Sequence, residues 1–146
     1  MTTSDSFKVL ASPFSPTYGQ VCILVNGQHF PDVEWSDFIF NVLGDWASIS
    51  RQLADGECQE HYFFDGPWMF VAHRAGDSVS VVCGSRYPHE GERLPSCTVS
   101  YKDYQRTIID ACMKAKSAAE DLGFQFPEGF AREAGLLKKA VDSPTP

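Results

Sequence analysis

The stretch HYFFDGPWMFVAHRAGDSVSVVC, residues 61–83, contains three apolar segments separated by two turn sequences. Asp65-Gly66-Pro67 divides the first segment from the second, and Ala75-Gly76-Asp77 divides the second from the third. Glycine, proline and aspartate favour turns because they adopt backbone conformations that other residues avoid. The spacing therefore predicts strands at 61–64, 68–73 and 78–83 that form an antiparallel meander.

A second hairpin is predicted upstream of this meander. Residues 20–25 are apolar and rich in β-branched side chains, and Asn26-Gly27 follows them. Asn-Gly favours a two-residue hairpin turn because both residues accept positive φ. The return strand covers 28–30. Residues 1–18 are rich in Ser, Thr and Pro, which predicts an irregular arm with at most a short strand at 7–10.

A long helix is predicted from Asp32, as its N-cap, to about residue 54. Its apolar residues recur every three or four positions and form one stripe, made of Trp35, Phe38, Ile39, Val42, Trp46, Ile49 and Leu53. Glu34, Asp37 and Asp45 fall together on a second face. A third face carries Phe40, Gly44 and Ala47, whose small residues allow another backbone to approach, either within the chain or from a second copy.

The C-terminal part is predicted to be mainly helical. After a strand at 96–99, Ser100-x-x-Asp103 resembles a capping box that opens a helix over 101–122, and Gly123 suits its C-terminus. A further helix is expected over 128–141, and residues 142–146 should be a disordered tail. These elements predict a single α+β domain over 19–141. An antiparallel sheet of about four to six strands packs against the tryptophan-rich helix and two C-terminal helices.

The charge of the chain is confined to one half. The 146 residues carry a formal charge of −7, with 12 Lys and Arg against 19 Asp and Glu. Residues 1–70 hold nine acids and two bases (2 − 9 = −7), whereas residues 71–146 hold ten of each. This balance argues against binding to nucleic acids or to anionic membranes, which select basic surfaces. No secretory leader is recognised, and five widely spaced cysteines suit a reducing compartment, so we expect a cytoplasmic protein.

No catalytic or metal-binding motif stands out. Cys58-x-x-His61 and Cys83 with His89 supply zinc-type ligands, but residues three apart on a strand point to opposite faces. Gly-x-Ser-x-Gly, Gly-x-Gly-x-x-Gly and Walker sequences are absent from the sequence. We therefore predict no catalytic residues, no metal, no cofactor and no enzymatic activity.

The acidic half is interleaved with aromatic residues, and this combination suits a surface that captures a basic protein partner. The predicted partner-binding residues are Glu34, Asp37, Asp45, Asp55, Glu57, Glu60, Phe64, Asp65 and Trp68. A solvated acidic face would give the same pattern. A different alternative is a small-molecule-binding or enzymatic domain, with a pocket between sheet and helices lined by His61, His73 and a carboxylate. A third is self-association through the Phe40–Gly44–Ala47 face.

The sequence also resembles a family of proteins. ILVNGQHFPDVEWSDFIFNVLGDWASISRQL, residues 23–53, followed by YFFDGPWMFVAH, residues 62–73, resembles small immunity proteins of bacterial polymorphic toxin and contact-dependent competition systems. The likeness covers about residues 21–73. It implies a small, acidic, cytoplasmic protein that neutralises a cognate toxin by covering its active site or substrate surface. The acidic charge would suit a basic nuclease or another toxin that modifies nucleic acids.

Overall fold

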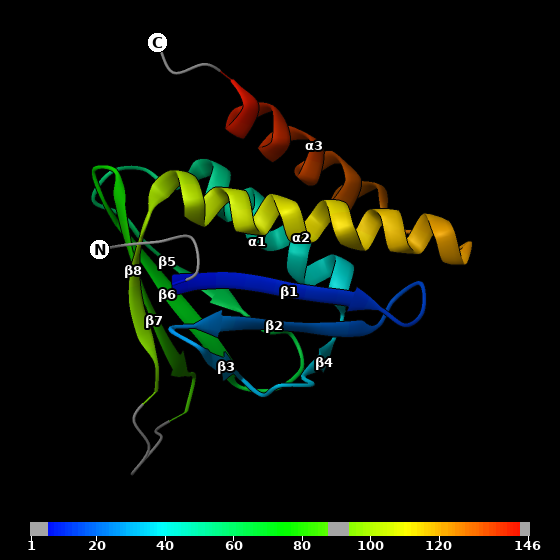
Figure 1. The fold of residues 1–146 in the computed structure, drawn as a ribbon, viewed down its shortest axis with the longest axis horizontal. Coiled ribbons are helices and arrows are strands. Elements are labelled where there is room, and N and C mark those ends of the chain that lie inside the picture. Colours follow the sequence, from blue (N-terminus) through cyan, green and yellow to red (C-terminus); the bar gives the residue numbers. More distant parts are fainter. Residues whose placement is uncertain (1–5, 88–93, 144–146) are drawn as a thin grey trace.

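The computed structural model describes residues 6–87 and 94–143 and confirms the α+β class. Eight strands form two antiparallel four-stranded sheets; the first two helices pack against the sheets, and the third packs on these two helices (Figure 1). The strands are β1 (Phe7–Pro13), β2 (Gly19–Val25), β3 (Gln28–Phe30), β4 (Ser36–Asp37), β5 (Cys58–Tyr62), β6 (Trp68–Ala75), β7 (Ser78–Ser85) and β8 (Ser96–Ser100). The helices are α1 (Ile39–Gln52), α2 (Tyr101–Leu122) and α3 (Glu128–Asp142).

The first sheet includes a strand where the sequence predicted an irregular arm. β1 runs antiparallel to β2 over seven residues, from Phe7 opposite Val25 to Pro13 opposite Gly19. Phe7 is buried on the inner face, so the segment contributes to the core instead of lying loosely on it. The free edge of β1 lies beside α2, where the Val9 amide donates to Thr107 Oγ1 at 2.9 Å (Figure 1).

The first helix begins seven residues later than Asp32, the predicted N-cap. The backbone before it pairs with β2 instead: Ser36 and Asp37 form β4, and the Val21 amide donates to the Trp35 carbonyl at 3.0 Å. These hydrogen bonds compete with helix formation because a backbone group cannot serve both structures. The Asp32 carboxylate accepts from the next amide, at 2.7 Å, and caps no helix.

The second sheet follows the predicted meander, in the order β5, β6, β7, β8. β5 lies at 58–62, not 61–64, and β6 and β7 are each two residues longer than predicted. The predicted turns are present: Gly66 and Gly76 both have positive φ, which glycine adopts without strain. Asn26 and Gly27 also have positive φ, as the predicted hairpin turn requires.

The C-terminal helices match their predicted bounds to within one residue. The Ser100 side chain accepts from the Asp103 amide, and Gly123 ends α2 in the left-handed conformation. α3 includes Asp142, the first residue of the predicted tail, and residues 144–146 lie outside the described part of the chain.

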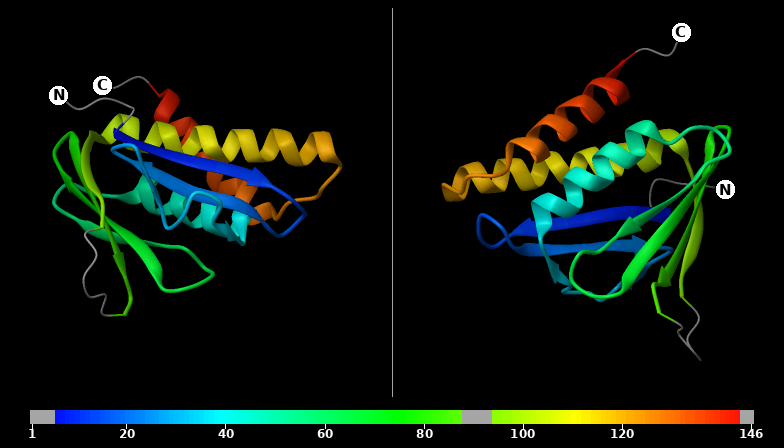
Figure 2. Two further views of the ribbon diagram at one scale, coloured as in Figure 1. Left: turned by 60° about the horizontal axis from the view of Figure 1, so that its bottom comes forward. Right: turned by 180° about the vertical axis from the view of Figure 1, so that it is seen from behind.

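The core lies where the helices meet the inner faces of the two sheets, and the buried apolar residues form one cluster. Trp46 of α1 lies at its centre and makes edge-on ring contacts with Phe63 and Phe70, at centroid distances of 5.1 and 5.0 Å. The turn between β1 and β2 and the connection between α2 and α3 lie toward the same end of the molecule (Figure 2). Within residues 6–87 and 94–143, no helix has the length and apolarity needed to cross a membrane.

Candidate partner-binding surface

The structure places Asp37 inside the protein, although the sequence predicted it on an acidic helix face. Its side chain is fully buried. The carboxylate accepts from Trp35 Nε1 at 3.0 Å, from the Phe38 amide at 2.7 Å, and from the Asp65 amide at 3.1 and 3.2 Å. Asp37 therefore cannot contact a partner. It joins the segment before α1 to the loop between β5 and β6.

Two other predicted acids hold a turn. The Asp55 carboxylate accepts from the Gly76 amide at 2.7 Å and so links the end of α1 to the β6–β7 turn. The Glu57 carboxylate accepts from the Ala54 amide at 2.7 Å within the same turn. Both side chains are exposed. These hydrogen bonds give both acids a structural role in the turn that requires no protein partner.

Glu34 and Glu60 are exposed and lie on different elements. Glu34 lies in the loop that precedes β4, and Glu60 lies in the middle of β5, the edge strand of the second sheet. Within the described residues, neither makes a side-chain hydrogen bond or ion pair. Because Asp37 is buried, the predicted acids do not all lie on the surface.

Three exposed phenylalanines lie on or next to segments that Tyr18 joins through its contacts. Phe14, Phe38 and Phe64 are 54%, 44% and 42% exposed, and they come from three segments distant in sequence. The Phe14 amide donates to the Tyr18 carbonyl at 2.9 Å, and the Tyr18 ring contacts the Phe38 ring edge-on at 5.1 Å. The Tyr18 hydroxyl donates to Asp65, next to Phe64. We call Phe14, Tyr18, Phe38, Phe64 and Asp65 the aromatic end.

Hydrogen bonds of Asp37 and Tyr18 hold the segments of the aromatic end together. The buried Asp37 carboxylate binds the amides of both Phe38 and Asp65, so the first residue before α1 and the β5–β6 loop share one anchor. The hydrogen bond to the Asp65 carboxylate is the main reason that the pKa of Tyr18 rises to about 12. Tyr18 therefore stays protonated and keeps donating at neutral pH.

Trp68 packs against the core next to this region and is only partly exposed. It is half-buried, and its ring packs edge-on against Phe30 at 5.6 Å. The neighbouring turn is tight: a Cβ at Gly66, whose φ is +108°, would lie 3.2 Å from the Trp35 ring. Of the two aromatic anchors predicted at the Asp-Gly-Pro turn, Phe64 is the one that is exposed.

Asp45 borders a shallow hollow between α1 and the start of α3. The hollow, of about 400 Å³, is lined by the exposed Phe64 and the buried Phe40 and Phe130, among other residues. Asp45 is half-buried, and this burial raises the pKa of its carboxyl group. Phe64 lines the hollow and is also part of the aromatic end, so the two features adjoin.

The histidines predicted for a small-molecule pocket do not meet. His61 is fully buried, with Nδ1 donating to the Gln59 carbonyl at 3.1 Å and Nε2 accepting from the Tyr104 hydroxyl at 2.6 Å. Burial lowers the pKa of His61 to about 3, so it is neutral at physiological pH. His73 is exposed on β6. A pocket lined by both histidines is therefore contradicted.

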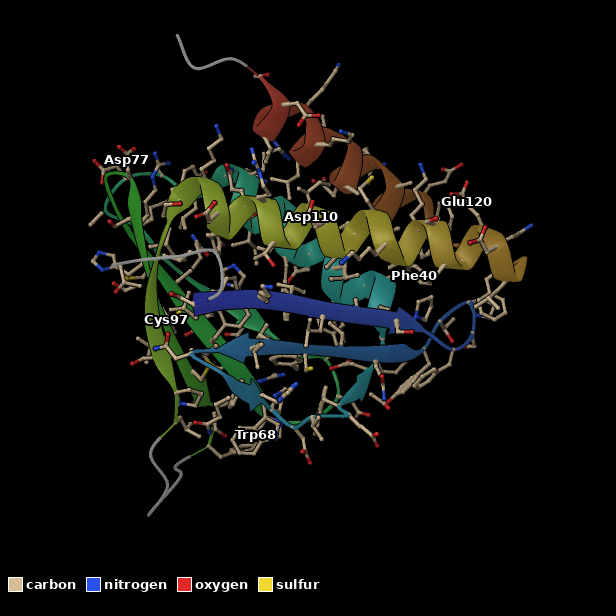
Figure 3. The ribbon with its side chains drawn as sticks, viewed as in Figure 1. Phe40, Trp68, Asp77, Cys97, Asp110 and Glu120 are labelled. Atoms are coloured by element: carbon tan, nitrogen blue, oxygen red, sulfur yellow. The ribbon has the colours of Figure 1, made fainter. Side chains whose placement is uncertain are left out.

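Another groove lies between β1 and the exposed side of α2. It encloses about 590 Å³ and is bordered by side chains of both charges, including Asp103, Arg106, Asp110 and Lys114 of α2, with Asp110 visible on the outer side of the helix (Figure 3). No histidine or cluster of like charges lines it. The groove carries no set of groups that defines a reaction.

The predicted zinc ligands are separated. Cys58 is exposed whereas His61 is buried, as expected for residues three apart on a strand. Cys83 is buried, and His89 lies outside the described residues. In the described part of the chain, no three His, Cys, Asp or Glu side chains are grouped to hold a metal.

The third face of α1 is part of the core. Phe40 and Ala47 are buried, and a Cβ at Gly44 would lie 3.3 Å from Phe130 Cα of α3. The small residue thus allows α3 to approach within the same chain. In this structure the face is not available for self-association.

The sequence did not single out Phe14, Tyr18 or Phe38 as site residues. Phe14 and Tyr18 belong to the segment predicted as an irregular arm, and Phe38 was assigned to the buried stripe of a longer helix. No signal in the sequence brings these residues together, because they lie on segments distant in sequence. Comparisons of the chain with protein-family models, curated proteins and solved structures found no match.

Proposed function

We propose that this protein is an immunity protein that binds a cognate bacterial toxin in the cytoplasm and blocks it by direct contact through the aromatic end. The observation that carries the proposal is that three exposed phenylalanines lie on segments joined by the hydrogen bonds of Asp37 and Tyr18. Exposed apolar side chains that come together on a surface mark protein-interaction sites, because a monomer gains nothing by keeping them in water.

The hydrogen bonds that hold the aromatic end favour high affinity for a protein partner. Binding orders mobile side chains and loops at a cost of about 0.5–1.5 kcal/mol for each immobilised side chain. Tyr18 already contacts Phe38 and Asp65, and Asp37 binds the backbone beneath them, so part of this ordering is complete before the partner arrives. Aromatic anchors at the centre of an interface commonly contribute most of the binding energy.

The charge suits a basic partner. Asp65 lies within the aromatic end and Asp45 borders the adjoining hollow, while Glu34 and Glu60 add exposed negative charge elsewhere. The net charge of −7 would accelerate association with a basic toxin surface and make the rate fall as salt is added. In this proposal Asp37 is a positioning residue, and Asp55 and Glu57 stabilise a turn. A basic nuclease or nucleic-acid-modifying toxin has the appropriate charge.

The proposal predicts that a gene for a large secreted protein lies directly upstream, and the test is a growth assay with the C-terminal domain of that protein. The domain is expressed in a laboratory bacterium, alone and with this protein. We expect growth arrest that the wild-type protein relieves and the double variant Phe38→Ala/Phe64→Ala does not. Val82→Ala, an exposed apolar residue on β7, is the matched control and should protect fully. Failure of the wild-type protein to protect would contradict the proposal, as would full protection by the double variant.

A further inference from the structure

The hollow beside Asp45 contains a carboxylate without a protein partner. Within residues 6–87 and 94–143, Asp45 makes no hydrogen bond or ion pair, although its side chain is half-buried. Partial burial removes some of the hydration of this carboxylate, and no hydrogen bond or ion pair within the described residues compensates for that loss. An arriving cation would supply that contact.

The neighbouring charged groups do not fill this role. Glu133 also borders the hollow, but its carboxylate lies 3.3 Å from Arg51. Arg132 is exposed on the α3 side and, in the described part of the chain, forms no ion pair with Asp45. The oxygens of Asp45 therefore remain available to a group that enters from outside.

Aromatic residues also line the hollow, together with Asn41, Ser48 and Pro127. Phe64 is exposed there, whereas Phe40 and Phe130 are buried, with ring centroids 5.0 Å apart. A guanidinium group is planar, so it can stack on an aromatic ring while its N–H groups bind a carboxylate. An ammonium group is more strongly hydrated and gains less from the aromatic wall.

We infer that this hollow receives an arginine side chain of the protein partner, with Asp45 binding the guanidinium and Phe64 stacking on it. The inference rests on the proposed function, since it names the chemistry of the partner at one point of the same surface. Asp45 and Phe64, both predicted from the sequence as partner-binding residues, then contact the same arginine.

The test uses the isolated protein and two short peptides. Acetyl-Gly-Arg-Gly-amide and its citrulline counterpart have similar shapes, but only the first is charged. Each peptide is titrated into the isotopically labelled protein, and amide chemical shifts are followed by NMR. We expect millimolar binding of the arginine peptide, with shifts centred on Gly44, Asp45 and Phe64. Asp45→Asn should weaken binding at least about fivefold, which corresponds to the loss of one exposed charge-assisted hydrogen bond.

Glu60→Gln is the matched control, because Glu60 is an exposed acid outside the hollow, and it should leave the affinity unchanged. Equal binding of the citrulline peptide, equal binding by Asp45→Asn, or shifts spread over all acidic residues would each overturn the inference. The growth assay is independent of this result. A toxin neutralised without an arginine in the hollow would leave the proposed function standing, whereas peptide binding without toxin neutralisation would remove the proposed function alone.

Discussion

Replacing Asp37 by alanine tests how the aromatic end is held. The substitution removes one carboxylate that accepts from Trp35 Nε1 and from the amides of Phe38 and Asp65. A buried donor left without an acceptor costs about 1–3 kcal/mol. Because the Asp65 loop is exposed and water can replace that acceptor, we take the lower part of this range for each of the three donors. The expected loss in the free energy of unfolding is about 3–5 kcal/mol, a large part of the 5–15 kcal/mol typical of a domain.

The measurement is urea unfolding followed by tryptophan fluorescence, together with hydrogen exchange at the Phe38 and Asp65 amides. Asp37→Asn retains one acceptor oxygen and should lose less stability than Asp37→Ala. Glu34→Ala is the control, since Glu34 is an exposed acid in the same segment and should change stability by no more than about 0.5 kcal/mol. An unchanged urea midpoint in Asp37→Ala, with both amides still protected, would refute the role assigned to Asp37.

Two further changes test the core. His61 has a pKa of about 3 in the folded protein and 6.5 when unfolded, so the unfolded state binds the proton first and stability is lost as the pH falls from 6.5 toward 3. Between pH 6.5 and 4.5 this amounts to about 2 kcal/mol, measured as the difference between wild type and His61→Phe, and an equal pH dependence of the two would contradict it. Gly44→Leu should destabilise the protein by about 1–3 kcal/mol by pushing Phe130 and α3 from α1, whereas Gly44→Ala should be nearly neutral because its helix propensity offsets a small shift. Thermal unfolding measures both variants, and equal melting temperatures would contradict this packing.

The elements with strong local signals were predictable from the sequence. The turn residues of the meander, the Asn-Gly hairpin and the Ser100 cap are each determined by short segments, and the structure has all of them. The start of α1 was not predictable in this way. The apolar spacing from Trp35 onward suits a helix, but pairing of residues 35–37 with β2 depends on a strand that is distant in sequence.

The candidate site was only partly predictable for the same reason. Phe64 and Asp65 lie in a recognisable turn, but Phe14 and Tyr18 reach them through the β1–β2 turn, which required β1 to be a strand. Asp37 was counted with the surface acids because its charge is visible in the sequence and its burial is not. A helix wheel assumes a helix, and Asp37 lies outside α1.

The central claim is that the aromatic end is the surface that binds the toxin. Isothermal titration calorimetry of the purified toxin domain with the wild-type protein, Phe38→Ala/Phe64→Ala and the control Val82→Ala tests it most directly. Each alanine removes an exposed aromatic anchor, and loss of such anchors costs about 2 kcal/mol or more apiece. We therefore predict that the double variant, which loses about 4 kcal/mol in all, binds about a thousandfold more weakly than the wild-type protein and the control. Equal affinities of all three proteins for the toxin domain would contradict the claim.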